Sequence, residues 1–105
     1  MKIRVLIVEP GSSPAVTEIE PTLEAMQEVV GGYVELVRVG DLDLWVNEEG
    51  ILEGLPLNRV IVGMPLVGPI LVASSNEEGD TVGLTDTQVA QALSLFSGPQ
   101  VEVFA

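Results

Sequence analysis

Apolar and polar residues alternate with period two over several short stretches of the chain, and this pattern predicts β-strands. In the first stretch, KIRVLIVEPG, β-branched residues dominate until Pro10-Gly11 ends the strand. AVTEIE follows the loop GSSP and is predicted to pair back on the first strand as a hairpin. YVELVRV and LWVN are separated by the turn GDLD, and together they predict a second hairpin.

Two other stretches repeat their apolar residues with a helical period. In PTLEAMQEVVGG, Pro21 suits the first helical position and Gly31-Gly32 supplies a left-handed stop. In LTDTQVAQALSLF, Thr85 is the predicted N-cap and Gln88 stands at the capping-box position. Gly98-Pro99 is expected to end this helix, and VEVFA predicts a last strand.

The middle of the chain is apolar and is interrupted by prolines and glycines. NEEG is predicted to be a turn in which Gly50 takes a positive φ, with Ile51-Leu52 continuing the strand pairing beyond it. LPLNRVIV and GPILVAS predict buried strands, and Pro65 and Pro69 confine the segment between them to a sheet edge or a crossover. The element order predicts an α+β fold, with two helices packed on a mostly antiparallel sheet.

Length and hydropathy bound the class of protein. The 105 residues, 47% of them apolar, predict one small domain over residues 1–105 with its own core. The apolar run at residues 60–73 is broken by prolines and glycines and is shorter than a bilayer span, and we recognise no signal peptide. We therefore expect a cytoplasmic protein without a membrane partner.

Histidine and cysteine are both absent, which changes the list of feasible chemistries. Disulfides, cysteine nucleophiles, histidine bases and zinc sites that need these side chains are excluded. Paired carboxylates can be drawn from the 16 acidic residues, but nothing in the sequence selects a pair. We therefore expect no enzymatic activity, no metal and no cofactor.

The formal net charge is −12, because the acidic residues face only Lys2, Arg4, Arg38 and Arg59. A surface of this sign repels phosphate backbones, so we expect no direct nucleic-acid binding. Two interpretations of the acidity remain. It keeps the chain dispersed in solution, or it attracts a partner with a basic surface.

The stretch NEEGILEGLPLNR contains the candidate binding residues, which are Asn47, Glu48, Glu49, Leu55, Pro56, Asn58 and Arg59. An arginine offers five N–H donors in a fixed fork that suits a carboxylate or a phosphate. The competing interpretation, which the sequence favours, is that Arg59 forms a salt bridge to a nearby acid at a bend in the fold.

Three further features each have a structural and a functional interpretation. Tyr33 and Trp45 are expected to be core anchors in preference to a recognition surface. The acidic turns at residues 48–49 and 76–80 offer oxygen ligands for calcium or magnesium, but they lack EF-hand spacing and are predicted to be solvated turns. An uncharged helix face is a hypothetical contact between copies of the chain; it consists of Thr87, Gln88, Gln91 and Ser94.

Five stretches carry a resemblance to a known family, and in chain order they read VLIVEPG, EIEPTLEAMQEVVGGY, NEEGILEGLPLNR, GPILVA and LTDTQ. They extend from Val5 to Gln88, and they resemble a family of small phage- and plasmid-encoded proteins known as a domain of unknown function. The resemblance implies an origin in a mobile genetic element of a bacterial cell. It brings no catalytic residues with it.

The residues and the resemblance together lead us to expect a small acidic accessory protein that binds a host protein, in counter-defence or host takeover. Two alternatives stay open at this point. One is the binding of a small ligand such as a signalling nucleotide, with Asn58 and Arg59 lining the site. The other is a structural or regulatory role in the mobile element.

Overall fold

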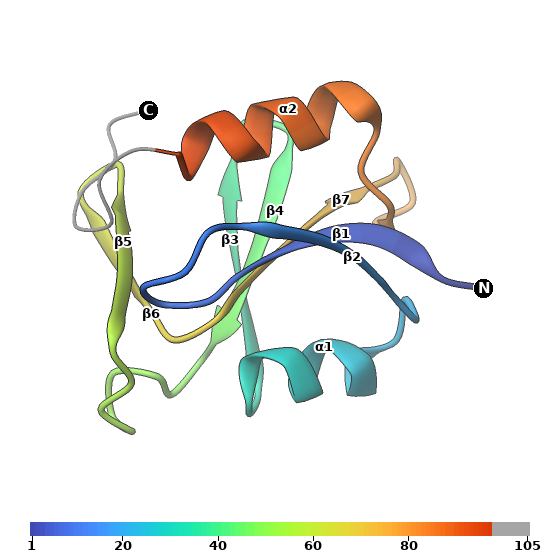
Figure 1. Ribbon diagram of the computed structural model, residues 1–105. Coiled ribbons are helices and arrows are strands. Elements are labelled where there is room, and N and C mark those ends of the chain that lie inside the picture. Colours follow the sequence, from blue (N-terminus) through green and yellow to red (C-terminus); the bar gives the residue numbers. More distant parts are fainter. Residues whose placement is uncertain (98–105) are drawn as a thin grey trace.

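The computed structural model describes residues 1–97, which form a larger sheet, a two-stranded sheet and two helices (Figure 1). The larger sheet has the strand order β2-β1-β7-β4-β3, and β8 extends it by pairing with β7. Its strands are β1 Ile3–Val8, β2 Ala15–Ile19, β3 Val34–Val39, β4 Leu42–Asn47, β7 Ile70–Ser75 and β8 Thr81–Val82. The remaining elements are β5 Leu57–Ile61, β6 Met64–Val67, α1 Leu23–Val30 and α2 Asp86–Leu95.

All strand pairs in the described part of the chain are antiparallel. The predicted α+β class therefore fits, although strands contribute more of the fold than the two helices do. Both predicted hairpins are present, because β1 pairs with β2 and β3 pairs with β4. The last strand, predicted at residues 101–105, lies outside the described residues.

The two helices cover opposite faces of the larger sheet (Figure 1). Side chains alternate across a strand, so neighbours in β1 and β7 belong to different cores. Leu6 and Val72 pack in the cluster that contains Phe96 at the end of α2. Val5 and Leu71 pack in a second cluster on the face of α1. The sheet is consequently buried on both sides at its centre.

Strands β5 and β6 form a separate two-stranded sheet at one end of the larger one (Figure 1). Ile61 and Leu66 anchor this hairpin, because both belong to the core cluster beneath α2. The sequence leaves open whether the segment between Pro65 and Pro69 is a sheet edge or a crossover, since Pro65 cannot donate a ladder hydrogen bond. A two-stranded sheet tolerates Pro65 because each of its strands has one unpaired side, as the predicted edge position requires.

Short-range signals define the helix ends. Thr22 is the N-cap of α1, and its Oγ1 accepts a hydrogen bond from the Ala25 amide. The helix therefore begins at Leu23, and the prediction of Pro21 as its first residue is wrong by two positions. Gly31 ends α1 with φ 82°, as predicted. The capping box of Thr85 and Gln88 at the start of α2 is confirmed. No helix within residues 1–97 is long and apolar enough to cross a membrane.

The turn after β4 differs from its prediction. Gly50 does not have the expected positive φ; Gly54 does, with φ 70°. Glycine is needed at position 50 because a Cβ there would lie 2.7 Å from Cγ2 of Val67. Ile51-Leu52 does not continue a strand and lies in this turn.

Tyr33 also departs from its predicted position. Its side chain is 66% exposed, so the prediction that it anchors the core is wrong. Trp45 is half-buried and packs against the cluster on the α1 face, as predicted. Tyr33 directly precedes β3, an edge strand, and only its backbone joins the hairpin, because its carbonyl accepts from the Glu48 amide at 2.8 Å.

Candidate binding sites

The candidate residues of the stretch 47–59 do not form one surface. Glu48, Glu49 and Pro56 are exposed, and Leu55 is half-buried. Three others are buried, namely Asn47, Asn58 and Arg59. The structure therefore divides the stretch into an exposed turn at its start and a buried polar pair at its end.

Asn47 organises the exposed turn from its buried position at the end of β4. Its Nδ2 donates to the Val30 carbonyl at 3.3 Å and to Oε1 of Glu53 at 3.2 Å. Its Oδ1 accepts from the Glu49 amide at 2.8 Å. These bonds join the end of α1 to the turn, so Asn47 positions the neighbouring glutamates.

A cavity of about 260 Å³ lies between this turn, the β3–β4 hairpin and β6. Two of its apolar side chains project into solvent, because Ile51 is 71% and Leu52 is 87% exposed. Within residues 1–97 the lining consists of Glu35, Val37, Val46, Asn47, Glu48, Ile51, Leu52, Met64, Pro65, Leu66 and Val67. Its charged members are both glutamates, and we call this site the acidic groove.

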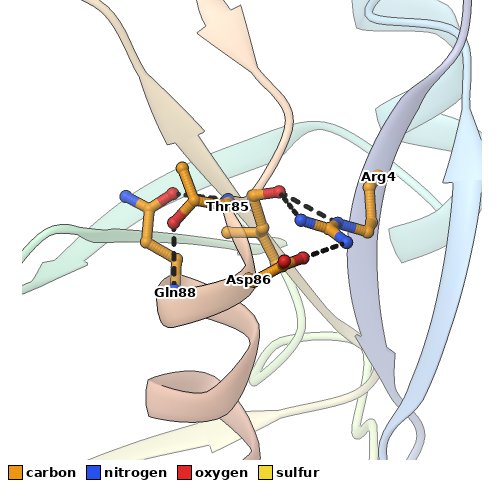
Figure 2. A network of polar contacts seen from close by, with 5 residues as sticks. Arg4, Thr85, Asp86 and Gln88 are labelled. Atoms are coloured by element: carbon orange, nitrogen blue, oxygen red, sulfur yellow. Dashed lines mark hydrogen bonds and ion pairs between the residues drawn. The ribbon is translucent and has the colours of Figure 1, made fainter.

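A different polar network fixes the start of α2 against β1 (Figure 2). Nε and Nη2 of Arg4 donate to the Leu84 carbonyl at 2.9 and 2.7 Å, and Nη1 lies 2.8 Å from Oδ1 of Asp86. Beside this contact, Thr85 and Gln88 exchange the two hydrogen bonds of the capping box. Arg4 thus orients a helix and does not line the acidic groove.

Asn58 is fully buried and connects three parts of the fold. Its Nδ2 donates to the Val8 carbonyl at 2.7 Å and to the Gly68 carbonyl at 2.8 Å. Its Oδ1 accepts from Nη1 of Arg59 at 3.0 Å. The amide therefore ties the end of β1 and the turn before β7 to β5, and it orients the neighbouring arginine.

Arg59 is the largest fully buried side chain in the described residues, with 1% of it exposed. Nη1 also donates to the Asn58 carbonyl at 3.0 Å, Nη2 donates to the Phe96 carbonyl at 3.2 Å, and Cζ lies 5.9 Å from the centroid of the Phe96 ring. Nε has no hydrogen-bond partner in the part of the chain that the structure describes. Burial lowers the pKa of Arg59, yet an arginine remains charged at neutral pH.

The salt bridge predicted for Arg59 is not present among the described residues. The ion pairs there involve the N-terminus, Arg4 and Arg38. Arg59 instead faces carbonyl and amide oxygens at the end of α2 and in β5. The sequence singled out this arginine correctly as unusual, but it suggested the wrong kind of partner.

A second cavity, of about 400 Å³, has Arg59 in its wall. We call it the Arg59 cavity, and its lining consists of Ser12, Ser13, Pro14, Arg59, Leu93, Phe96 and Ser97. These residues come from the β1–β2 loop, from β5 and from the end of α2. Sequence analysis missed the serines, because GSSP reads as an ordinary polar loop and lies 45 or more residues from Arg59.

The other predicted features occupy ordinary surface positions. On α2, Gln88 is half-buried and its Nε2 donates to Oγ of Ser74 at 3.0 Å, while the rest of the uncharged face is exposed. In the acidic loop, Oδ1 of Asn76 accepts from the amides of Glu78 and Asp80. No group of three acidic, histidine or cysteine side chains in residues 1–97 is arranged to hold a metal ion.

Comparison with known proteins gives one match. No curated protein and no solved structure matches the chain. A family model described as "Domain of unknown function (DUF3846)" matches residues 1–97, which is nearly the whole chain. The protein therefore belongs to the domain-of-unknown-function family DUF3846.

Proposed function

We propose that this protein acts without catalysis, by binding a partner protein at the acidic groove. The observation that carries the proposal is the exposure of Ile51 and Leu52 beside a cavity whose charged lining residues are Glu35 and Glu48. Interfaces combine an apolar centre with a polar rim, and adjacent large apolar side chains that remain in solvent as one patch mark such surfaces.

The groove also defines the chemistry of its partner. The cavity of about 260 Å³ has room for a large apolar side chain, and the glutamates around it attract lysine or arginine beside that anchor. Asn47 already holds the Glu49 backbone in place, so little ordering is needed on binding. The expected partner segment is an apolar anchor flanked by basic residues.

An origin in a phage or plasmid extends this proposal. In that setting the partner is a host protein, and occupation of its basic surface serves counter-defence or host takeover. A host protein that handles nucleic acid has such a surface, because it must neutralise phosphates. A chain with net charge −12 competes for the same surface.

Charge reversal in two acidic turns tests the electrostatic part. The chain offers a matched control, because Glu48-Glu49 and Glu77-Glu78 are both exposed pairs of adjacent glutamates. After a partner is captured from host lysate and purified, we expect Glu48→Lys/Glu49→Lys to slow association roughly tenfold at low salt. Glu77→Lys/Glu78→Lys should have a clearly smaller effect. Equal rate changes for both double variants would contradict steering by the groove.

Removal of an apolar anchor tests the contact itself. Leu52→Ser changes a side chain that contributes little to the core, so the melting temperature should stay the same while affinity for the partner falls roughly tenfold or more. Val16→Ser in the edge strand β2 is the control, because Val16 is also exposed but lies outside the groove. Unchanged affinity of the Leu52→Ser variant would refute the proposed site.

A further inference from the structure

We propose that the Arg59 cavity binds a small monoanionic carboxylate with an apolar body. The cavity shares no lining residue with the acidic groove, so this site is independent of the partner-binding proposal. It combines a buried cation, hydroxyl groups and an apolar wall. Pockets of this kind hold small ligands, with few polar groups fixing the orientation of an apolar body.

The guanidinium has hydrogen-bonding capacity to spare. It carries five N–H groups, two on Nη1, two on Nη2 and one on Nε. Within residues 1–97 these groups have three acceptors, two from Asn58 on Nη1 and the Phe96 carbonyl on Nη2. Among these described residues Nε has no hydrogen-bond acceptor. Nε–H and the second N–H of Nη2 match the two oxygens of a carboxylate, which an arginine grips with parallel hydrogen bonds.

The local charge also favours an anion. The chain has 16 acidic residues, yet the lining residues within the described part of the chain comprise one cation and no carboxylate. The carbonyl end of α2 offsets only about half of an elementary charge. Arg59 therefore keeps a net positive charge in a desolvated position, which is costly unless an anion approaches it.

The charge balance selects a monoanion over a phosphate. A phosphate group carries up to two negative charges and is usually held by several cations or by a cradle of backbone amides. Here a single guanidinium is available, in a molecule of net charge −12. A carboxylate neutralises that one cation, while Leu93 and Phe96 contact its apolar body and Ser12 and Ser13 offer hydroxyl donors.

A purely structural role for Arg59 leads to different expectations. In that role the guanidinium would only join α2 to β5 through the Phe96 and Asn58 oxygens. Carboxylates would then leave the stability of the protein unchanged, and the Nε–H group would not respond to them. Ligand-dependent measurements therefore separate the two roles.

The test uses benzoate as the probe, benzamide as its uncharged counterpart and inorganic phosphate as a competing anion. We expect benzoate to raise the melting temperature of the full chain in a saturable way, and more strongly than phosphate at the same ionic strength. Benzamide should have no effect. A larger shift with phosphate than with benzoate would overturn the carboxylate assignment.

Variants connect the effect to the guanidinium. Arg59→Met should bind benzoate roughly tenfold to a hundredfold more weakly than the native chain. Removal of the buried charge offsets part of the stability that is lost with the hydrogen bonds, so we expect the Arg59→Met variant to fold. Lys2→Gln removes the same charge from an exposed position and should bind benzoate normally. An identical benzoate shift in the Arg59→Met variant would overturn the proposal.

Nuclear magnetic resonance gives a direct reading that does not depend on the Met variant. The Nε–H signal of Arg59 is assigned by its absence from an Arg59→Lys sample, since lysine has no Nε–H fork. Benzoate should move this signal with the same saturation curve as the melting temperature. A signal that stays in place while benzoate binds would mean that the ligand occupies another site.

Discussion

At the scale of the residue, Asn58 has the most demanding environment, because it is fully buried and every polar atom of its side chain is used. Asn58→Leu would leave the Val8 and Gly68 carbonyls without their donor and remove an acceptor from Arg59. Unsatisfied buried groups cost about 1–3 kcal/mol each. We expect the free energy of unfolding in urea to fall by roughly 2–4 kcal/mol.

A second asparagine provides the comparison for this prediction. Asn76 accepts two hydrogen bonds from backbone amides, whereas Asn58 donates two to carbonyls, and Asn76 lies in an exposed loop where water can replace its side chain. Asn76→Ala should therefore destabilise the protein much less than Asn58→Leu does. Similar losses of unfolding free energy for the two variants would show that burial of the Asn58 amide adds no stability.

The same pair of buried residues shows what sequence alone reveals at this scale. An arginine beside an asparagine in an acidic chain identified Arg59 as a site candidate, because arginine is scarce here. Its surroundings could not be predicted, since they come from Phe96 and from the loop at residues 12–14, far away in the sequence. Residue type indicates what a side chain can bind, whereas the fold determines what it meets.

At the scale of the element, the tip of the β5–β6 hairpin is strained. Val62 has φ 50° and Gly63 has φ 74°, and a β-branched residue rarely adopts such a conformation. This cost is about 1–2 kcal/mol for residues other than glycine. Val62→Asn should therefore raise the free energy of unfolding by roughly 1 kcal/mol, because asparagine tolerates the left-handed region.

Calorimetry or urea titration checks this stabilisation. Val60→Asn does not test the same strain, because Val60 is half-buried within β5 and lies outside the tip. A melting temperature for Val62→Asn at or below that of the native chain would rule out strain at the tip. The side chain of Val62 is 63% exposed, so little apolar burial opposes the gain. Strained exposed residues are often retained for contact with another molecule.

The start of α2 allows a second prediction at this scale. Thr85→Ala removes the side chain that accepts from the Gln88 amide, and we expect a loss of about 1 kcal/mol in the free energy of unfolding. Asp86→Asn removes the charge opposite Arg4, but the Asp86 side chain is almost entirely in solvent, so the loss should be smaller. Thermal denaturation of both variants measures which one loses more stability. A larger loss for Asp86→Asn than for Thr85→Ala would contradict the prediction.

Elements with clear local signals were predictable, and short strands that exist only through pairing with a neighbouring strand were not. The capping box defines α2, and Gly31 ends α1 where the sequence indicates. Strand β6 contains Pro65 and exists because β5 pairs with it, and β8 consists of two residues paired with the end of β7. No short-range pattern of apolar residues reports such pairing.

At the scale of the whole molecule, the excess of acidic residues sets the response to salt. The 16 acidic residues repel one another in the folded chain, and ions screen this repulsion. We expect the melting temperature to rise between about 10 mM and about 300 mM sodium chloride. Glu77→Gln/Glu78→Gln should reduce the size of this rise, because both side chains are exposed and neither forms an ion pair within residues 1–97.

The order of strands in the larger sheet was beyond prediction from the pattern, because it depends on where β7 inserts. Pairing of β1 with β2 and of β3 with β4 follows from short connections, whereas β7 joins β1 to β4 across most of the chain. The α+β class follows from the content of strands and helices. The sheet order requires knowledge of long-range contacts.

This central position of β7 has a consequence for how the chain acquires its structure. Two early hairpins would each present an open strand edge until β7 arrives between β1 and β4 and closes both at once. Pairing between residues far apart in the sequence is slow, because the entropy of the long intervening loop is lost before the stabilising contacts form. Pulsed hydrogen exchange during refolding should show protection of β3–β4 before β7, and simultaneous protection of all three would exclude this sequence of events.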